Sequence, residues 1–550
     1  MPATPARVRR RRLASAAVGL ALASLAAATA CDPESPPKGG SSSAPAPSGS
    51  ARPTATGTSG GGTTVPTGGP SSPAGTTAPA TPPASTPAPG TPPAASGPLP
   101  FDMPGTAALR SSPKKVFAHY FTPYPISLNN AQGADDYYTK HYLNPAGENG
   151  KHQPYGGLLR DRPVPRAPLP GDWELQDMET EVRTAVSAGI DGFTVDLLNL
   201  APGTPHRKRV ELLVKAAERV DPGFRIVLMP DMTATQVKGL DPAGLAAALA
   251  GLAGSKSVQT LGDGRLVVSP FKAEERPAQW WRDFMAAMEA NHGKKVALVP
   301  VFLNLGANAD AFAPISHGFS VWGNRSPKAQ AGIAGDAAKA HGLGKIWMQP
   351  VSVQDERPNQ GIFDEAGNTE NLRATWQGAI DKGADWVQLT TWNDYSEGTQ
   401  FAPSVHNGRV YLDISAYYLT WFKTGKQPAV VRDVIYLTHR KQFAATRPGA
   451  AGQTKFMAPR GGSTPPRDTA EVLAFLTAPA AIRAQSGTQV RDVQAPAGPS
   501  AHLVPLGYGA QTATATRGTA AVATVTSPFP LTQNTSIQDL QYVAAGSARP

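Results

Sequence analysis

An alternation of short apolar segments with amphipathic ones runs from residue 113 to residue 427, and it constrains the fold more than any other feature. The apolar segments have the length and the Val, Ile, Leu and Phe content of strands, and the amphipathic segments repeat at helical spacing. Runs such as Val296–Val299 are apolar at every position, as in parallel strands that are covered on both faces. Strands are expected at Lys115–Phe121, Gly192–Leu198, Phe224–Asp231, Leu266–Phe271, Val296–Leu303, Gly318–Trp322, Ile346–Val351 and Trp386–Trp392.

Helices are expected between these strands. They are placed at Trp173–Ala188, Arg207–Val220, Pro242–Leu252, Pro277–Asn291, Pro327–His341 and Glu370–Lys382, with a short one near Asn308–Ile315 and a last one at Ile414–Thr424. Eight strands that alternate with helices predict an α/β fold of the (β/α)8-barrel class for residues 111–427. A doubly wound open parallel sheet is the alternative.

The pattern changes after Gln427 and Pro428, where helical spacing gives way to short β-prone segments separated by Gly and Pro turns. These segments are Val431–Leu437, Ala470–Leu476, Thr488–Val493, His502–Leu506, Ala510–Thr516 and Ala520–Thr526. The last two flank Arg517 and Gly518, which is typical of a hairpin. A C-terminal β-sandwich is therefore predicted for residues 428–550. Its low aromatic content favours a domain that packs on the barrel over one that binds sugar.

Residues 31–110 consist almost entirely of Pro, Gly, Ala, Ser and Thr. Phrases such as SSSAPAPSGS have no hydrophobic period and cannot bury a core, so a disordered tether is predicted. As a flexible coil of about 70 residues it would span roughly 45–50 Å, and Pro-rich extension would take it towards about 200 Å. That reach suits a domain presented through a cell-wall layer, and a solubilising spacer is the alternative.

Residues 1–30 have the form of an export signal. Five arginines between positions 7 and 12 precede an apolar run from Leu13 to Ala30, which gives the charged and apolar regions of a signal peptide. Ala28-Thr29-Ala30 is a small-x-small cleavage site, and Cys31, the single cysteine, follows it. The segment ending at Cys31 resembles a bacterial lipobox. Lipid on Cys31 is therefore expected to anchor the protein at the outer face of the cell membrane, with secretion as the alternative.

Charge and motifs exclude several classes of function. The signal segment holds five arginines and no acidic residue, so it accounts for about half of the formal net charge of +10. The rest of the sequence contains no stripe of Lys and Arg of the kind that binds nucleic acid. The barrel segment has no Gly-rich phosphate loop after its first strand, no His/Cys cluster at zinc spacing and no Gly-x-Ser-x-Gly elbow. We therefore expect a monomer that needs no metal or organic cofactor.

Polar and aromatic residues gather where the expected strands end. In a barrel these carboxyl ends form the active site. Four carboxylates fall there: Asp196, Asp231, and the pair Asp394 and Glu397 in the segment TTWNDYSEGTQ. Carboxylates act as acids and bases on glycosidic bonds, amides bind hydroxyls, and flat rings stack on sugar faces. The candidates for substrate binding are His119, Tyr120, Asp231, Asn304, Trp322, Gln349, Trp392, Asn393 and Tyr395.

Structural roles are the alternative for several of these residues. His119 could be a hydrogen-bonded core histidine, Trp322 and Trp392 could be core rings, and Asp394 could cap a turn. Other acids are predicted to be structural from the start. Asp191 precedes the second strand, at the stabilising face of a barrel, and Asp177 and Glu181 are assigned to the solvated face of the first helix.

These motifs together resemble glycoside hydrolase family 71. The resemblance rests on VFAHYF, DWELQDMETEVRTAVSAGIDGFTVDLL, LMPDMT and TTWNDYSEGTQ in the barrel, and on DTAEVLAFLTAPAAIRAQ and VQAPAGPSAHLVPL in the tail. It extends over residues 113–550. The family consists of endo-α-1,3-glucanases, also called mutanases, and the resemblance implies a (β/α)8 barrel, a C-terminal β-sandwich and inverting hydrolysis of α-1,3-glucan.

The resemblance places the essential acids on Asp394, Glu397 and Asp196. Glu397 is expected to protonate the leaving oxygen, Asp394 to activate a water on the opposite face, and Asp196 to orient the sugar at the cleavage site. Inversion requires the two carboxyl groups to stand about 6.5–9.5 Å apart. We expect burial and the neighbouring negative charge to raise the pKa of the acid.

Two features depart from the family pattern. Ser396 replaces the usual glycine before the glutamate, and Asn129–Pro170 forms a long loop rich in Tyr, His, Asn and Gly. The sugar linkage is therefore less constrained than the reaction. An endo-acting α-mannosidase or another α-glycan hydrolase is the alternative enzyme, and a non-catalytic polysaccharide-binding surface lipoprotein is the alternative of another class.

Overall fold

The computed structural model describes residues 99–449 and 452–548. The signal segment, Cys31 and most of the expected tether lie outside these ranges. Residues 99–110, which the sequence assigns to the end of the tether, contain helix α1 (Thr106–Arg110) and contribute Phe101 and Leu109 to the core. Within the described ranges, every helix is too short or too polar to span a lipid bilayer.

One nine-stranded parallel sheet forms the centre of the larger unit, with the order β5-β4-β3-β2-β1-β11-β8-β7-β6. The strands are β1 (Lys115–Tyr120), β2 (Gly192–Leu197), β3 (Arg225–Pro230), β4 (Leu266–Val268), β5 (Val296–Leu298), β6 (Val301–Phe302), β7 (Gly318–Val321), β8 (Ile346–Val351) and β11 (Trp386–Leu389). Each coincides with an expected strand, and β5 and β6 divide one of them. The predicted α/β class is confirmed, and the sheet with its helices is a TIM-barrel-like unit.

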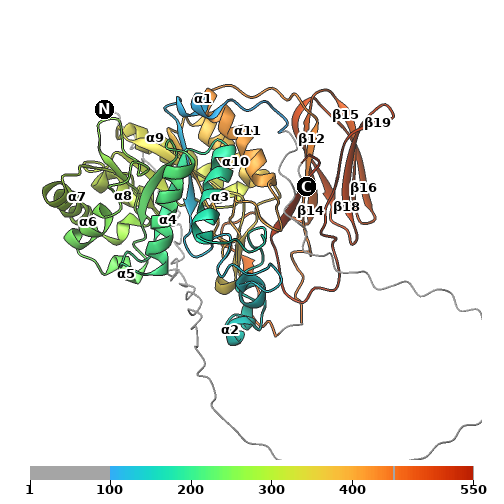
Figure 1. Cartoon of the computed structure of the whole chain (residues 1–550). Helices are drawn as coiled ribbons and strands as arrows, with labels where there is room; N and C mark the ends of the chain where they lie inside the picture. The colour runs from blue at the N-terminus through green and yellow to red at the C-terminus, as the bar shows by residue number, and fades with distance from the viewer. Residues whose placement is uncertain (1–98, 450–451, 549–550) are drawn as a thin grey trace, which may run out of the picture.

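Helices follow the strands along the chain and lie against the sheet (Figure 1). The longer ones are α3 (Trp173–Ser187), α4 (Pro205–Val220), α6 (Pro242–Ala250), α7 (Ala278–His292), α8 (Leu305–Phe312), α9 (Gln330–Gly342), α10 (Glu370–Asp381) and α11 (Val410–Thr424), and α2 (Gly147–Gly150) and α5 (Thr235–Lys238) are short. Local chemistry sets their starts. Thr204 accepts a hydrogen bond from Arg207 N, Asp241 accepts one from Gly244 N, and a proline follows each cap.

The two ends of the sheet order are consecutive in the chain, because only Val299 and Pro300 separate β5 from β6. Backbone bridges join Phe271 to Val301 and Leu298 to Ser316 across this break. The apolar side chains on one face of the sheet meet in a single cluster: Phe117, Val227, Met229, Val267, Ala297, Val299, Val301, Met348 and Trp386. Strands from both ends and the middle of the sheet therefore contribute to one core.

Side chains alternate between that cluster and the helix layer, as the period of two along a strand requires. In β1, Phe117 belongs to the inner cluster, whereas Val116, Ala118 and Tyr120 belong to the core under the helices. The same alternation puts His119 on the inner side of the sheet. This register decides which candidate residues can reach the carboxyl-end rim.

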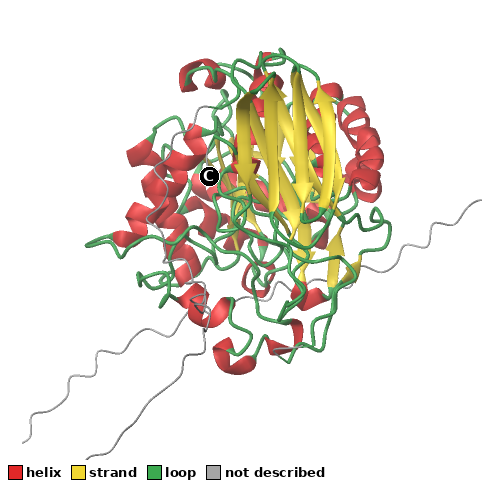
Figure 2. Cartoon of the chain, turned by 90° about the vertical axis from the view of Figure 1, so that its right-hand side faces the viewer, coloured by secondary structure: helices red, strands yellow, loops and turns green. Residues whose placement is uncertain are grey.

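Two four-stranded antiparallel sheets make up the C-terminal part, with orders β17-β14-β12-β20 and β16-β15-β18-β19. Their strands are β12 (Val434–Arg440), β14 (Thr469–Leu476), β15 (Ala480–Ser486), β16 (Gln489–Ala495), β17 (Gly498–Pro505), β18 (Gln511–Arg517), β19 (Ala520–Thr526) and β20 (Tyr542–Gly546). A core of small and branched residues from both sheets holds them face to face, and Figure 2 shows them beside the helices of the larger unit. The sequence predicts six of these strands and misses β15 and β20.

A small sheet joins the two units. The hairpin of β9 (Asp355–Arg357) and β10 (Ile362–Asp364) follows β8, and β13 (Ala458–Pro459) from the C-terminal part pairs with β10. A second junction is buried nearby, where Arg440 Nη2 donates to Glu365 Oε2 at 2.7 Å and Arg440 Nε donates to the Leu540 carbonyl at 2.9 Å. The C-terminal part is therefore attached through polar contacts close to the end of β8, and it also packs apolar side chains such as Tyr436 and Phe475 into the core of the larger unit.

Candidate active site

Three candidate side chains meet at the carboxyl ends of β1, β2 and β7. His119 Nε2 lies 4.0 Å from Asp196 Oδ2, and the His119 ring packs edge-on against Trp322 with 4.9 Å between ring centroids. Trp322 also packs on Phe271 and is partly exposed. The structure therefore brings together a carboxylate, an imidazole and an accessible indole on the inner side of the sheet.

His119 is neutral in this setting. Burial, together with the positive charge of Arg325, lowers the pKa of its imidazole to about 3. Nδ1 of His119 lies 3.2 Å from the sulfur of Met229, and Nε2 faces the carboxylate of Asp196. A neutral imidazole can donate to or accept from a sugar hydroxyl, so the arrangement suits binding rather than charge stabilisation.

The loop after β11 holds the paired acids. Asp394 is buried, and its Oδ1 accepts hydrogen bonds from Ser396 N at 3.1 Å and from Ser396 Oγ at 2.6 Å. The backbone N–H of Asp394 donates to Thr391 Oγ1 at 2.8 Å. Burial raises the pKa of the Asp394 carboxyl, while Ser396 and Arg357 oppose that rise. Ser396, which departs from the family pattern, therefore holds one carboxylate oxygen of Asp394.

Glu397 differs from Asp394 in its surroundings. Its Oε1 is ion-paired with Arg357 Nη1 at 2.6 Å, and its Oε2 is buried without a hydrogen-bond partner. Burial raises the pKa of the Glu397 carboxyl to about 8, and Asp394 and Asp355 add to the rise while Arg357 opposes it. Glu397 is therefore protonated near neutral pH, whereas Ser396 stabilises the ionised form of Asp394.

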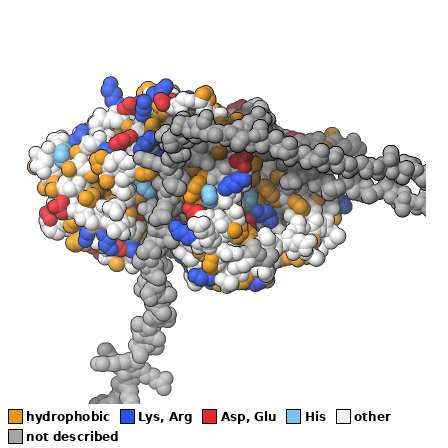
Figure 3. Space-filling view, turned by 60° about the horizontal axis from the view of Figure 1, so that its bottom comes forward, with side chains coloured by type: hydrophobic (Ala, Val, Ile, Leu, Met, Phe, Trp, Pro, Cys, Tyr) orange, Lys and Arg blue, Asp and Glu red, His pale blue; other side chains and the backbone are white. Residues whose placement is uncertain are grey.

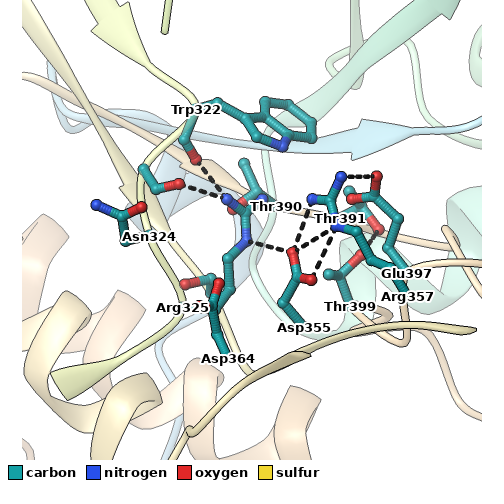
Figure 4. A network of polar contacts seen from close by, with 12 residues as sticks. Trp322, Asn324, Arg325, Asp355, Arg357, Asp364, Thr390, Thr391, Glu397 and Thr399 are labelled. Atoms are coloured by element: carbon teal, nitrogen blue, oxygen red, sulfur yellow. Dashed lines mark hydrogen bonds and ion pairs between the residues drawn. The ribbon is translucent and has the colours of Figure 1, made fainter. Parts of the chain in front are cut away.

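A network of charges surrounds Glu397 (Figure 4). Arg357 binds Asp355 through both Nε and Nη2, at 2.8 and 2.7 Å, and Arg325 Nε stands 3.9 Å from Asp355 Oδ2. Arg325 is anchored by the carbonyls of Trp322 and Gly323, and its guanidinium lies 5.1 Å from the centroid of the Trp322 ring. This arginine therefore links the Trp322 side of the rim to the Glu397 side.

Three predicted substrate contacts point away from the rim. Tyr120 is fully buried and donates to the Met178 sulfur on α3, and Gln349 Oε1 accepts from Trp347 Nε1 at 2.8 Å. Trp392 is fully buried against Phe193, with 5.1 Å between ring centroids. The hypothesis that these side chains contact sugar is wrong, because the strand period or the turn after β11 directs them into the core.

Two further candidates hold the loop itself. Asn393 Oδ1 accepts from Phe121 N at 2.7 Å, and Asn393 Nδ2 donates to the carbonyls of Phe121 and Tyr124. Tyr395 is buried in an aromatic cluster with Tyr124. Both side chains connect the acid loop to the segment after β1. The amide of Asn393 is already hydrogen-bonded and Tyr395 is buried, so neither offers a free group for binding a sugar hydroxyl.

Asn304 and Asp231 occupy different settings. Asn304 is exposed and caps α8, where its Oδ1 accepts from Ala307 N at 3.1 Å. Asp231 is buried at the end of β3 and accepts from Thr233 N and Thr233 Oγ1, both at 2.7 Å. Burial raises the pKa of the Asp231 carboxyl, and the hydrogen bonds from Thr233 oppose the rise.

The assignment of Asp177 and Glu181 to a solvated face is wrong. Asp177 is buried and paired with Arg166 at 2.6 Å, and Glu181 is buried with its Oε2 2.6 Å from Trp392 Nε1. Burial raises the pKa of the Glu181 carboxyl to about 8. The structural role predicted for Asp191 is matched by its ion pair with Lys423 Nζ at 2.7 Å.

Sequence reasoning missed Arg325, Asp355 and Arg357 as site residues. One signal was present, because the run Gln354-Asp355-Glu356-Arg357 places three charges directly after the apolar strand β8. Among the described residues, no group of three or more His, Cys, Asp or Glu side chains is arranged to hold a metal ion.

A TIM-barrel-like sheet that carries buried carboxylates in contrasting surroundings beside an indole at its carboxyl-end rim is the arrangement of a glycoside hydrolase. Residues 170–545 match glycosyl hydrolase family 71. Because that match covers well over half of the chain, the chain belongs to this family and is a glycoside hydrolase.

Two relatives and one solved structure illustrate the likeness. The chain is 25% identical over 368 residues to a mutanase of Penicillium rubens, which covers 62% of this chain and 78% of the relative. It is 22% identical over 244 residues to the ascus wall endo-1,3-alpha-glucanase of Schizosaccharomyces pombe, which covers 42% of this chain and 54% of the relative. The GH99 endo-alpha-mannosidase from Bacteroides thetaiotaomicron aligns with a TM-score of 0.45 at 14% identity, over 56% of this chain and 97% of that one.

Proposed function

We propose that this glycoside hydrolase cleaves α-1,3-glucan with inversion, using Glu397 as general acid and Asp394 as general base. The observation that carries the proposal is the asymmetry between the two carboxyl groups of one loop. Ser396 hydrogen-bonds Asp394, whereas Oε2 of Glu397 has no hydrogen-bond partner. A pair of carboxyls in different surroundings, one hydrogen-bonded as an acceptor and one with a buried oxygen free of hydrogen bonds, suits a general base and a general acid of glycoside hydrolysis.

The proposed reaction proceeds in one displacement. Glu397 gives its proton to the glycosidic oxygen as the bond from that oxygen to the anomeric carbon breaks. Asp394 takes a proton from a water that attacks the anomeric carbon from the opposite face. The product sugar leaves with inverted configuration, and solvent returns each carboxyl to its starting state.

Binding of the sugar is assigned to the His119 side of the rim. Asp196 and neutral His119 offer hydrogen-bonding groups for hydroxyls, and partly exposed Trp322 offers a ring for stacking. Asp231 is kept as a contact at the end of β3. The described side chains left uncovered in Figure 3 show acidic and basic groups interspersed over the surface. Mixed charge of this kind is suited to a neutral polysaccharide, which needs no electrostatic steering.

The proposal includes a closed (β/α)8 barrel. Three observations support closure. The break between β5 and β6 is short, and backbone bridges span it. Side chains from strands at both ends and in the middle of the sheet order meet in the inner cluster. Asp196 and Glu397 do not depend on closure, because β2 and β11 are the two neighbours of β1 in the sheet. The proposed domains are the barrel, residues 111–427, and the β-sandwich, residues 428–550. Residues 99–110 are added to the barrel unit.

Substrate and mechanism are tested with one experiment. Purified protein is incubated with insoluble α-1,3-glucan, other α-glucans and α-mannan, and reducing ends and product lengths are measured. NMR of the first product distinguishes inversion from retention. Release from α-1,3-glucan with β-configured product is expected, whereas preference for α-mannan would replace the substrate assignment, and α-configured product would replace the mechanism.

Export and lipid attachment at Cys31 are part of the proposal, and both rest on residues 1–31 of the sequence. Labelling with radioactive palmitate is expected to mark the wild-type protein and not a Cys31→Ala variant. Wild-type protein should fractionate with membranes, and the variant should appear in the medium. Identical fractionation of the two proteins would remove the anchor from the proposal.

A further inference from the structure

The guanidinium of Arg357 lies between two carboxylates at the end of β9. Its Nε and Nη2 grip Asp355, and its remaining Nη1 stands 2.6 Å from Glu397 Oε1. Arg357 is almost wholly buried, and its planar fork fixes the direction in which Nη1 points. One oxygen of the Glu397 carboxyl is therefore held by a geometry that Asp355 imposes.

The hairpin that carries Arg357 is itself held from both sides. On one side, Glu356 N donates to the Glu397 carbonyl at 2.7 Å. On the other, Arg460 from the C-terminal part lies 3.3 Å from Asp355 Oδ1 and 3.1 Å from Asp364 Oδ2. The contact between Arg357 and Glu397 therefore rests on hydrogen bonds and ion pairs from three separate stretches of chain.

Four charged groups face Glu397 from the elements packed around it. Arg357 and Asp355 belong to β9, Asp394 belongs to its own loop, and Arg325 follows β7. Of these, Arg357 makes the ion pair with Glu397, and it opposes the two carboxylates. An arginine stays charged at any pH at which such an enzyme works, so its influence on Glu397 is permanent.

We propose that Arg357 is a positioning residue that orients the Glu397 carboxyl and sets how readily it releases its proton. The inference rests on the proposed role of Glu397 as general acid. An acid in a buried site beside two carboxylates would otherwise hold its proton too tightly to transfer it well, and a general acid works best when its pKa lies near the working pH. Arg357 supplies the opposing charge without contacting the reacting bond.

The pH dependence of kcat/KM on α-1,3-glucan tests this role. Arg357→Gln removes the positive charge that lowers the pKa of Glu397. Burial, Asp394 and Asp355, which all raise this pKa, remain, so the pKa of Glu397 is expected to rise. The alkaline limb of the profile is therefore expected to move to higher pH by about 1–3 units. Because Arg357 also lowers the pKa of Asp394, the acidic limb should move in the same direction. Arg357→Lys keeps the charge and should shift both limbs less.

A control variant separates this effect from a general loss of structure. Arg110 pairs with Asp221 through two bonds of 2.6 Å at the opposite end of the strands, so Arg110→Gln removes a comparable ion pair far from Glu397. Both limbs of the pH profile of Arg110→Gln should lie at the same pH values as in the wild type. Where Arg357→Gln does not fold, the double variant Asp355→Asn with Arg357→Gln leaves no unpaired carboxylate at position 355. Because Asp355 itself raises the pKa of Glu397, the double variant is compared with Asp355→Asn alone, and its alkaline limb should lie at higher pH.

The outcomes distinguish the inference from the proposed function. An alkaline limb that stays at the wild-type position in Arg357→Gln, or at the Asp355→Asn position in the double variant, overturns the inference even when Glu397→Gln is inactive. Activity of Glu397→Gln at the wild-type rate overturns the acid assignment instead. Upward movement in Arg357→Gln, a smaller movement in Arg357→Lys and none in Arg110→Gln together support the positioning role.

Discussion

The indole N–H of Trp392 donates to Oε2 of Glu181 at 2.6 Å, joining two residues that are 211 positions apart in the chain. Trp392 comes directly before the acid loop, and Glu181 lies on α3, behind the sheet. The contact anchors the start of the loop to the helix layer. A tryptophan that looks like a sugar platform in the sequence thus fixes the backbone from which Asp394 and Glu397 project.

The Glu181 side chain should make stability depend on pH. Its pKa is raised from 4.5 to about 8 in the folded state, so the folded protein keeps a proton that the unfolded chain has lost above pH 4.5. Stability from this residue therefore falls as pH rises from about 4.5 to 8. Glu181→Gln removes the ionisation and can still accept from Trp392, so its free energy of unfolding at pH 8 should exceed the wild-type value by on the order of 1–3 kcal/mol.

Denaturant unfolding at pH 4.5 and pH 8 measures this difference. The gain should be small at pH 4.5, where both proteins are neutral at this position. Glu174→Gln, which breaks a surface ion pair with Lys208, is the matched control and should show no such pH dependence. A Glu181→Gln variant that is less stable than wild type at pH 8 would contradict the assignment.

Removal of either acid should abolish hydrolysis. Glu397→Gln and Asp394→Asn are each expected to lower kcat/KM on α-1,3-glucan by about 10²–10⁴-fold, the usual contribution of general acid–base catalysis. Gln279→Ala, at an exposed position on α7, should leave kcat/KM nearly unchanged. Wild-type rates in both acid variants would refute the site.

Added azide should separate the roles of the two acids. Azide needs no general base, so it should restore bond cleavage in Asp394→Asn and yield a glycosyl azide of inverted configuration. It should not rescue Glu397→Gln on an unactivated glucan, because the leaving oxygen still lacks a proton donor. Mass spectrometry of the products detects the azide adduct, and rescue of Glu397→Gln alone would exchange the roles.

The wild-type enzyme should lose activity on the alkaline side as Glu397 ionises. Burial raises the pKa of this carboxyl to about 8, so kcat/KM is expected to fall as pH rises through that value. Below it, Glu397 holds the proton that the leaving group requires. Initial rates between pH 4 and pH 10, with folding monitored by circular dichroism, measure the limb. A fall already centred near pH 4.5 would mean that Glu397 titrates as an ordinary carboxyl.

Trp322 should contribute to substrate affinity. Trp322→Ala removes a partly exposed ring that packs on His119 and Phe271, and we expect KM to rise by roughly 3–10-fold, from about 0.5–1.5 kcal/mol of ring contact. Trp392→Phe deletes the bond to Glu181 and should instead lower thermal stability with little selective change in KM. An unchanged KM in Trp322→Ala would remove the sugar platform from this side of the rim.

Much of this architecture follows from local sequence. The continuous apolar runs of β4 and β5 are typical of parallel strands covered on both faces, and the proline after Thr204 marks the start of α4. Strands of this kind expose their side chains at the carboxyl end, so Asp394 and Glu397 could be placed at a rim without coordinates. The strands β9 and β10 were missed because each has only three residues, and β10 pairs on its other side with Ala458 and Pro459, which lie far along the chain.

Residue type and spacing thus determined the class of fold and the family, and they predicted the pair of acids. The tertiary structure alone decided what surrounds each side chain. Strand register turned Tyr120 and Gln349 into the core, and α3 buried Glu181 beneath Trp392. The hairpin after β8 brought Arg357 to Glu397. Burial and neighbouring charge set the ionisation of a carboxyl, and both depend on contacts between segments that lie far apart in the chain.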